Sequence, residues 1–380
     1  MTSSGSGRPL RVTYLITSSG GGGAEQQVRA LALAFRRRGW DVGVVSMLPL
    51  EALLLELREH DVQVATLGMS RGVPDPRALV RLSRLIRRWR PDVLHAHMVH
   101  ANLLARLSRL LVPIPVVVST IHNQDEGAQW RYVAYRLTDR LSDVTTSVSR
   151  LAVDEAVRRG AVARGRIQLV PNGIALREHG RKAVVRDTAR RDLGLSDRFI
   201  WLAVGRLAEA KAYPDMVAAF RRVLDADTRA VLLIAGEGPL EPAIRSAIDS
   251  AGLQDFVRLL GWRSDVPALM QAADAFVMSS VWEGLPIVLL EASASSLPIV
   301  ATDVGGSRDT IVDASSGHIT PPADPAALAG AMLLVMALPE ADRLAMGEVA
   351  REHVSRVFDL ETVADAWDDL YRHHLPVVRR

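Results

Sequence analysis

Short aliphatic runs alternate with longer segments of helical periodicity along nearly all of the 380 residues. The runs have the length of strands, and the segments between them repeat apolar residues every three or four positions. Strands that alternate with helices pair in parallel, and parallel sheets are covered by helices on both faces. The expected strands are residues 12–16, 42–45, 62–67, 93–95, 116–119 and 144–147, and then 200–204, 231–235, 257–260, 275–279 and 299–302.

This alternation is interrupted at residues 171–186 (PNGIALREHGRKAVVR), where Pro, Gly and charged residues dominate. A chain of this length also exceeds what one compact core usually holds. We therefore expect an α/β protein of two doubly wound, Rossmann-like domains that face each other across a cleft. The predicted domains are residues 9–178 and 186–356, with a final helical segment, 357–380, that packs back on the first domain.

Charge is divided unevenly between the two halves, although the net formal charge is only +3. Residues 1–178 hold 25 Lys and Arg against 15 Asp and Glu, whereas the remainder holds 21 against 28. Only two basic residues are lysines, Lys182 and Lys211, so each is a candidate for a specific role. The absence of cysteine excludes disulfides, thiolate metal sites and thiol nucleophiles.

No apolar run approaches the roughly 20 residues of a membrane-spanning helix, and residues 10–16 lack a signal-peptide cleavage pattern. We expect a cytoplasmic protein. The predicted helix 76–89 carries four arginines opposite an apolar stripe. They are Arg77, Arg81, Arg84 and Arg88. A solvated helix face is the default interpretation, and the alternative is peripheral contact with an anionic membrane at its inner face.

A glycine-rich loop, TSSGGGGAEQQ (17–27), follows the first expected strand and leads into a helix. Its glycines would let backbone N–H groups approach an anion beside the helix N-terminus. The loop lacks the G-x-G-x-x-G spacing of dinucleotide-binding proteins, and no acidic residue closes the second strand at Ser46, which argues against a dehydrogenase. A flexible tight turn is the alternative.

Three loops of the second half follow strands at their carboxyl ends, where open parallel sheets bind ligands. VGRLAEAK (204–211) offers the planar fork of Arg206 and the mobile charge of Lys211 to phosphate oxygens, or is a solvated loop with two ordinary cations. GEGP (236–239) and then LGW follow the next two strands. Trp262 is expected either to stack on a base or to cap the core rim.

The stretch EGLPIVLLE (283–291) places glutamates at both ends of an apolar segment. Pro286 suits the first turn of a helix whose aliphatic residues are then buried. Because side chains tilt toward the helix N-terminus, Glu291 can reach a ribose whose diphosphate lies at residues 285–287. Glu283 can meet the sugar beyond the distal phosphate. The alternative is two unrelated glutamates, one capping and one ion-paired.

Three histidines, His95, His97 and His100, lie at and after a predicted strand end, but no thiolate or carboxylate cluster completes a metal site there. We expect no metal and no cofactor. For His97 and His100, an acceptor-side role and a purely structural role stay open. The D-x-D sequence at 225–227 follows a helix and precedes a strand, so it is interpreted as a solvated turn.

Together and in this order, the motifs resemble the retaining GT-B glycosyltransferases of family 4 over residues 10–370. In the first half the matching motifs are GGGGAEQQ, HAHMVHAN (95–102), STIHN (119–123) and LVPNGI (169–174). In the second half they are GR with Lys211 five residues later, GEGP, LGW, the E-x7-E of EGLPIVLLE, and PIVATDVGG (298–306).

The resemblance implies a role for each matching position. Arg206 and Lys211 would neutralise the donor diphosphate in place of a metal ion, Glu283 would bind the donor sugar, and Glu291 would bind the ribose. His122 would lie near the reacting centre. The remaining donor contacts would come from Gly22, Gly23, Gly236, Trp262, Gly284, Leu285, Pro286 and Ile287.

The reaction implied by the resemblance transfers a sugar from a nucleoside diphosphate, with a UDP-sugar favoured, to an acceptor hydroxyl with retention of configuration. The acceptor would be a glycan on a polyprenyl carrier, in polysaccharide or antigen assembly, and no nucleic-acid partner is expected. Two rival functions stay open: a sugar-nucleotide epimerase on the same fold, and a non-catalytic nucleotide- or glycan-binding protein. The residues alone indicate a phosphate-binding cleft.

Overall fold

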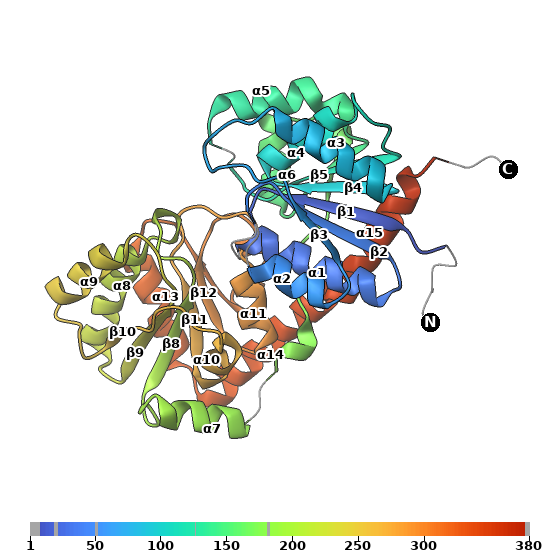
Figure 1. Cartoon of the computed structure of the whole chain (residues 1–380). Coiled ribbons are helices and arrows are strands. Elements are labelled where there is room, and N and C mark those ends of the chain that lie inside the picture. Colours follow the sequence, from blue (N-terminus) through green and yellow to red (C-terminus); the bar gives the residue numbers. More distant parts are fainter. Residues whose placement is uncertain (1–7, 19–21, 50–51, 126, 181–182, 377–380) are drawn as a thin grey trace. The chain divides into compact units, whose positions relative to one another are not determined.

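The computed structural model describes the chain except for residues 1–7, 19–21, 50–51, 126, 181–182 and 377–380. The chain divides into two compact units. The first comprises Met1–Gly173 with Leu360–Arg380, and the second comprises Ile174–Asp359. Each unit is built around one parallel sheet (Figure 1). Lys182 lies outside the described residues.

The first unit has a seven-stranded parallel sheet in the order β3-β2-β1-β4-β5-β6-β7. β1 lies between β2 and β4, so the strand order reverses at that point. The strands are β1 (Arg11–Ile16), β2 (Asp41–Ser46), β3 (Gln63–Thr66), β4 (Val93–His97), β5 (Val116–Ile121), β6 (Val144–Ser147) and β7 (Ile167–Leu169). The helices are α1 (Gly23–Arg37), α2 (Ala52–Glu59), α3 (Arg77–Trp89), α4 (Val99–Ser108), α5 (Gln129–Thr138), α6 (Arg150–Arg158) and α15 (Leu360–His374).

The second unit has a six-stranded parallel sheet in the order β10-β9-β8-β11-β12-β13, with the reversal at β8. The strands are β8 (Phe199–Val204), β9 (Ala230–Ala235), β10 (Val257–Leu259), β11 (Ala275–Met278), β12 (Ile299–Thr302) and β13 (Gly317–Thr320). The helices are α7 (Ala183–Asp192), α8 (Tyr213–Ala226), α9 (Glu241–Ser250), α10 (Val266–Ala272), α11 (Ile287–Ala294), α12 (Ser307–Thr310), α13 (Pro325–Ala337) and α14 (Glu340–Val357).

Both faces of the second sheet are buried, as the strand β8 illustrates. Trp201 and Ala203 belong to the hydrophobic core on one face, whereas Ile200 and Leu202 belong to the core on the other. Because successive side chains of a strand point to opposite faces, such a strand is apolar throughout. The prediction of two parallel sheets covered by helices is therefore confirmed.

Two strands, β7 and β13, are missing from the sequence-based prediction. β7 has only three residues, of which Gln168 and Leu169 are exposed, and β13 begins with Gly317 and continues with a histidine. Neither has the aliphatic run of a strand buried on both faces. The segment 171–186, expected to be irregular, contains a 3-10 turn at Leu176–Glu178 and the start of α7.

None of the described helices is by itself long and apolar enough to span a membrane. α13 and α14 meet that criterion only when they are joined, and the chain bends by 116° between them.

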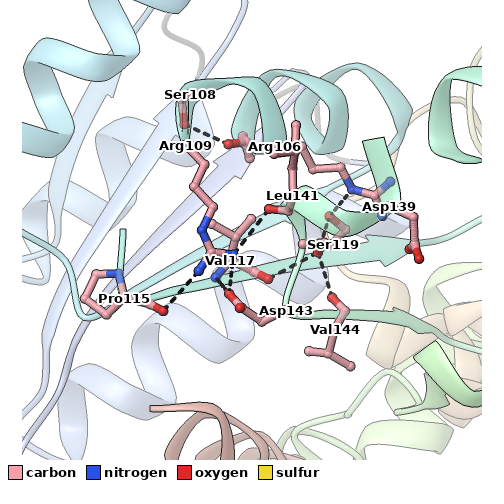
Figure 2. A network of polar contacts seen from close by, with 12 residues as sticks. Arg106, Ser108, Arg109, Pro115, Val117, Ser119, Asp139, Leu141, Asp143 and Val144 are labelled. Atoms are coloured by element: carbon pink, nitrogen blue, oxygen red, sulfur yellow. Dashed lines mark hydrogen bonds and ion pairs between the residues drawn. The ribbon is translucent and has the colours of Figure 1, made fainter. Parts of the chain in front are cut away.

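A buried arginine of the first unit connects α4 and α5 to the strands β5 and β6, and Figure 2 shows its bond to Ser119. Arg106, on α4, is fully buried and donates from Nε to Ser119 Oγ (3.0 Å), from Nη2 to Thr145 Oγ1 (2.7 Å) and from Nη1 to the carbonyl of Tyr135 (3.0 Å). It has no ion pair with a carboxylate among the described residues. Burial lowers the pKa of Arg106. Its hydrogen bonds fix β5, which leads directly into His122.

Candidate donor site and histidine cluster

The second unit brings a lysine and a glutamate together at the carboxyl ends of its two central strands. Lys211 ends the 3-10 turn Glu209–Lys211 after β8, and Glu283 lies in the loop after β11. Lys211 Nζ donates to Glu283 Oε1 at 2.6 Å, and Ser280 Oγ donates to the same oxygen at 2.8 Å. Only 19% of the Lys211 side chain and 16% of the Glu283 side chain are exposed. Glu283 is therefore ion-paired in the structure, as the alternative interpretation of the two glutamates expected for one of them.

Glycines let the loops around this ion pair approach each other closely. Gly236 has a φ of +147°, and a Cβ atom there would lie 2.0 Å from the carbonyl oxygen of Gly205. Gly305 has a φ of +51°, and its Cβ would lie 2.3 Å from the carbonyl oxygen of Gly284. No side chain fits at either position. The loops after β8 and β9, and those after β11 and β12, are thus joined backbone to backbone.

The stretch 283–291 forms a loop followed by α11, as expected. The helix begins at Ile287, so Pro286 is its N-cap residue and not its first helical residue. Leu289 and Leu290 are fully buried, and Glu291 lies partly exposed in the second turn. Gly284 and Leu285, in the loop before the helix, are buried.

Two other candidates of this unit lie at its surface. Arg206 is exposed and has no ion pair among the described residues. Trp262 is 69% exposed, so the alternative that it caps the core rim is wrong. Its backbone N–H donates to Glu237 Oε1 at 3.3 Å, which holds the loop after β10 beside the loop after β9.

Two hydrogen-bonding residues at and beside the ion pair were not singled out from the sequence. Ser280 donates to Glu283, and Tyr213, at the start of α8, donates from its hydroxyl to the carbonyl of Gly205 (3.1 Å). Burial, with a smaller contribution from the charge of Glu283, raises the pKa of Tyr213, so it stays a neutral donor. The only signal for Ser280 in the sequence is that it carries a hydroxyl three residues before Glu283. The sequence contains no signal for the role of Tyr213.

The D-x-D sequence is unrelated to this site. Asp225 pairs with Arg221 and Asp227 with Arg229 at the end of α8, which is the amino end of β9. Asp225 thus belongs to the last turn of α8 and Asp227 caps the helix, so the expected solvated turn begins only after Asp225.

In the first unit, α1 begins at Gly23 with Gly22 as its N-cap. Both glycines are exposed, whereas Glu25 in the first turn is buried and accepts a hydrogen bond from Ser18 Oγ at 2.6 Å. A Cβ atom on Gly22 would lie 2.6 Å from Glu25 Oε2, so a larger residue there would require the Glu25 side chain to shift. The other two glycines of the loop lie outside the described residues.

Histidines from two neighbouring strands of this unit form a buried cluster. His97 Nδ1 and His122 Nε2 share a hydrogen bond of 2.8 Å. His95 bonds through Nδ1 to the hydroxyl of Tyr371, on α15, and through Nε2 to Thr120 Oγ1, both at 2.7 Å. His95 is thus a satisfied structural histidine. The histidine ring of His100 lies apart, exposed on α4, with its centroid 6.4 Å from that of Trp130.

These buried histidines are neutral at pH 7. Burial lowers the pKa of His122 to about 4, and burial with the neighbouring His95 and His122 lowers that of His97. Among the described residues, no group of three or more His, Asp or Glu side chains is arranged to hold a metal ion.

Comparison with known proteins identifies the class that this fold defines. The chain has the GT-B fold: it superposes on the crystal structure of Anabaena Alr3699/HepE in complex with UDP with a TM-score of 0.86, at 19% identity, over 96% of this chain and all of that one. The family model of glycosyl transferases group 1 matches residues 185–353, and that of glycosyltransferase family 4 matches residues 21–178.

The chain belongs to the glycosyltransferases of family 4 and group 1, and it is a glycosyltransferase. A curated relative is the UDP-Gal:alpha-D-GlcNAc-diphosphoundecaprenol alpha-1,3-galactosyltransferase of Escherichia coli, 26% identical over 65% of this chain and 67% of its own length. Another is the glycogen synthase of Mycobacterium tuberculosis, 29% identical over 82% of this chain and 76% of its own length. The relatives act on different acceptors, so membership alone does not define the substrate.

Proposed function

We propose that this glycosyltransferase transfers a sugar from a nucleoside diphosphate donor, with a UDP-sugar favoured, to an acceptor hydroxyl with retention of configuration and without a metal ion. The observation that carries this proposal is the Lys211–Glu283 ion pair at the carboxyl ends of β8 and β11. Ligands of open parallel sheets bind at that edge, next to the strand where the order reverses.

The ion pair suits a donor diphosphate and its sugar. A diphosphate carries more negative charge than one carboxylate, so it competes for the Lys211 ammonium and releases Glu283 to accept hydrogen bonds from sugar hydroxyls. Ser280 keeps that carboxylate in place during the exchange. Arg206, which is exposed and has no ion pair among the described residues, adds a second charge to the diphosphate.

With the diphosphate at Lys211, we assign the remaining contacts of the donor to the other candidate residues. The backbone of Gly236 and of Gly284, Leu285, Pro286 and Ile287 lines the diphosphate, Glu291 holds the ribose, and Trp262 stacks on the base. In the first unit we propose that Gly22 and Gly23 contact the donor phosphates, that His122 acts at the reacting carbon, and that His97 and His100 serve the acceptor side.

In this mechanism the C–O bond between the sugar and the diphosphate breaks as the acceptor oxygen bonds to the same face of the anomeric carbon. The departing phosphate oxygen takes the acceptor proton, so no protein nucleophile is needed. Arg206 and Lys211 stabilise the charge that grows on the leaving group.

We further propose that the acceptor is a glycan on a polyprenyl diphosphate at an anionic membrane. The name of the Escherichia coli relative supports a lipid-linked acceptor. The surface of three adjacent helices, α3, α4 and α5, supports the proposed contact with a membrane (Figure 1). α5 exposes Trp130, Val133 and Leu137 along one stripe, and α3 exposes Arg84 and Arg88. Arg81, which was expected to belong to the arginine stripe of α3, instead pairs with Asp75 at 2.5 Å.

Incubation with a panel of UDP-, GDP- and ADP-sugars tests the reaction. Transfer that requires an acceptor, with the anomeric configuration of product and donor equal by NMR, supports the proposal. Consumption of the donor without acceptor indicates the epimerase, and binding without turnover indicates the non-catalytic protein.

Co-sedimentation with vesicles tests the membrane contact separately. Phosphatidylglycerol vesicles should retain the wild type, and phosphatidylcholine vesicles should not. Leu137→Ser should weaken retention, whereas Leu334→Ser, which changes an exposed leucine of the second unit, should not. Equal retention of both variants contradicts the proposed surface.

A further inference from the structure

The hydrogen bond between His97 and His122 leaves one nitrogen of each ring without a partner in the part of the chain that the structure describes. Nε2 of His97 is buried and has no hydrogen-bond partner among the described residues. His122 uses Nε2 for the shared bond, so its Nδ1 is the atom left for a ligand. Which of the two free nitrogens carries a proton decides what His122 can offer, since a neutral histidine has one N–H and one acceptor nitrogen.

Two arrangements of protons are possible for this pair. If His122 donates from Nε2, then His97 carries its proton on Nε2, where a buried N–H would lack an acceptor. If His97 donates from Nδ1, the unpaired Nε2 is only an acceptor. Orphaned buried N–H groups are rarer in proteins than acceptors that lack a donor. The second arrangement is therefore favoured, and it places the proton of His122 on Nδ1.

The surroundings of His97 keep its ring in this orientation. The ring of His95 lies against it with centroids 4.1 Å apart, and Tyr14 packs at 5.8 Å. His95 is itself fixed by Tyr371 and Thr120, and the ring of Trp367 covers it at 4.5 Å. Since each ring is held by the next, His97 cannot turn to exchange its two nitrogens without disturbing the cluster.

We propose that His97 is a positioning residue that fixes His122 in the Nδ1–H tautomer, so that His122 presents a hydrogen-bond donor to an oxygen of the bound sugar substrate. This inference rests on the proposed function for the identity of that ligand. His97 acts through His122 and need not touch the substrate, so for this residue the positioning role replaces a direct acceptor contact. Metal-bound histidines are oriented in a similar way, by a neighbouring residue that hydrogen-bonds to the ring nitrogen opposite the metal and so sets the tautomer.

The tautomer can be measured without any substrate. In the full chain labelled with ¹⁵N-histidine, long-range ¹H–¹⁵N spectra at pH 7.5 distinguish the tautomers, and His122→Gln assigns the His122 signals. We expect His122 to be protonated at Nδ1 in the wild type. In His97→Leu, which removes the donor, it should shift toward the Nε2–H form. A wild-type His122 protonated at Nε2 overturns the proposal, as does a tautomer that His97→Leu leaves unchanged.

Two further variants separate positioning from packing. His97→Asn places an amide donor near the position of Nδ1, so it should retain the Nδ1–H form of His122. His97→Leu should lower kcat by about tenfold to a hundredfold, and His97→Asn should recover part of that loss. His95→Leu, a change of an equally buried histidine two residues away, should destabilise the protein but shift the tautomer less than His97→Leu does, because His97 keeps its Nδ1 donor.

A shift of the tautomer in His95→Leu equal to that in His97→Leu would overturn the specific role of His97. If the wild type turns over no nucleotide-sugar, the proposed function fails while the spectra still decide the tautomer.

Discussion

The ammonium nitrogen of Lys211 lies 2.6 Å from Oε1 of Glu283, although 72 residues separate the two in the sequence. They meet because β8 and β11 are neighbours in the sheet and each strand leads into one of the two loops. The two charges neutralise each other at the edge of the sheet where ligands bind. A ligand that carries both phosphate and hydroxyl groups can replace this ion pair, with its phosphate on Lys211 and its hydroxyls on Glu283.

Glu283→Gln and Glu291→Gln should have different kinetic effects. Glu291 is expected to bind the ribose, far from bond breaking, so its loss should raise KM for the donor more than it lowers kcat. Glu283 is expected to hold the sugar that gains charge in the transition state, so its loss should lower kcat. UDP binding should not weaken, because Lys211 loses the carboxylate that competes with the diphosphate. Donor kinetics and UDP calorimetry on both variants test this. If Glu283→Gln weakens UDP binding as much as Glu291→Gln does, the assignment of Glu283 to the donor sugar and Glu291 to the ribose is wrong.

Activity should survive excess chelator, because Arg206 and Lys211 supply the positive charge that a metal ion would give to the leaving group. The measurement is turnover before and after treatment with EDTA. Loss of turnover that Mg²⁺ or Mn²⁺ restores would contradict the proposed mechanism.

The stability that His122 contributes should depend on pH. Burial lowers the pKa of His122 to about 4 in the folded protein, whereas an unfolded histidine titrates near 6.5. The unfolded state therefore binds more protons between these values, and stability is lost as the pH falls from 6.5 toward 4. The stability difference between wild type and His122→Gln should shift by about 2 kcal/mol in favour of the variant between pH 7.5 and pH 5.

Urea unfolding of both proteins across that range measures the shift. A difference that stays constant with pH would show that His122 is not held neutral by burial.

Arg106→Lys should destabilise the first unit by roughly 2–4 kcal/mol, because an ammonium group cannot replace the bonds of the guanidinium to Ser119, Thr145 and the Tyr135 carbonyl. Arg109→Lys is the matched control. Arg109 lies three residues away and pairs with Asp143 at a partly exposed position, so its change should cost less than about 1 kcal/mol. Equal losses in thermal or urea unfolding would show that the buried bonds of Arg106 contribute no more to stability than the partly exposed ion pair of Arg109.

The sequence predicted the two sheets because strands buried on both faces must be apolar throughout, as β8 is. It did not predict β7, since a three-residue edge strand with two exposed residues has no such pattern. The loops of the candidate site were recognisable from Arg206, Lys211 and the E-x7-E spacing.

Contacts between distant segments could not be predicted in the same way. The meeting of Lys211 with Glu283 depends on strand order, and that of His95 with Tyr371, 276 residues apart, depends on α15 packing in the first unit. Neither strand order nor the residues at which a packed helix makes its contacts follow from local residue spacing.

The central claim is that the Lys211–Glu283 pair marks the donor site, and titration of UDP by calorimetry on the full chain tests it most directly. The wild type should bind UDP. Lys211→Met should weaken binding at least tenfold and lower turnover by roughly a hundredfold or more, because a charge positioned at the leaving group is lost. Arg229→Met, which removes an exposed arginine at the opposite edge of the sheet, should leave both unchanged. A wild type that does not bind UDP, or a Lys211→Met variant that binds it and turns over as the wild type does, would contradict the claim.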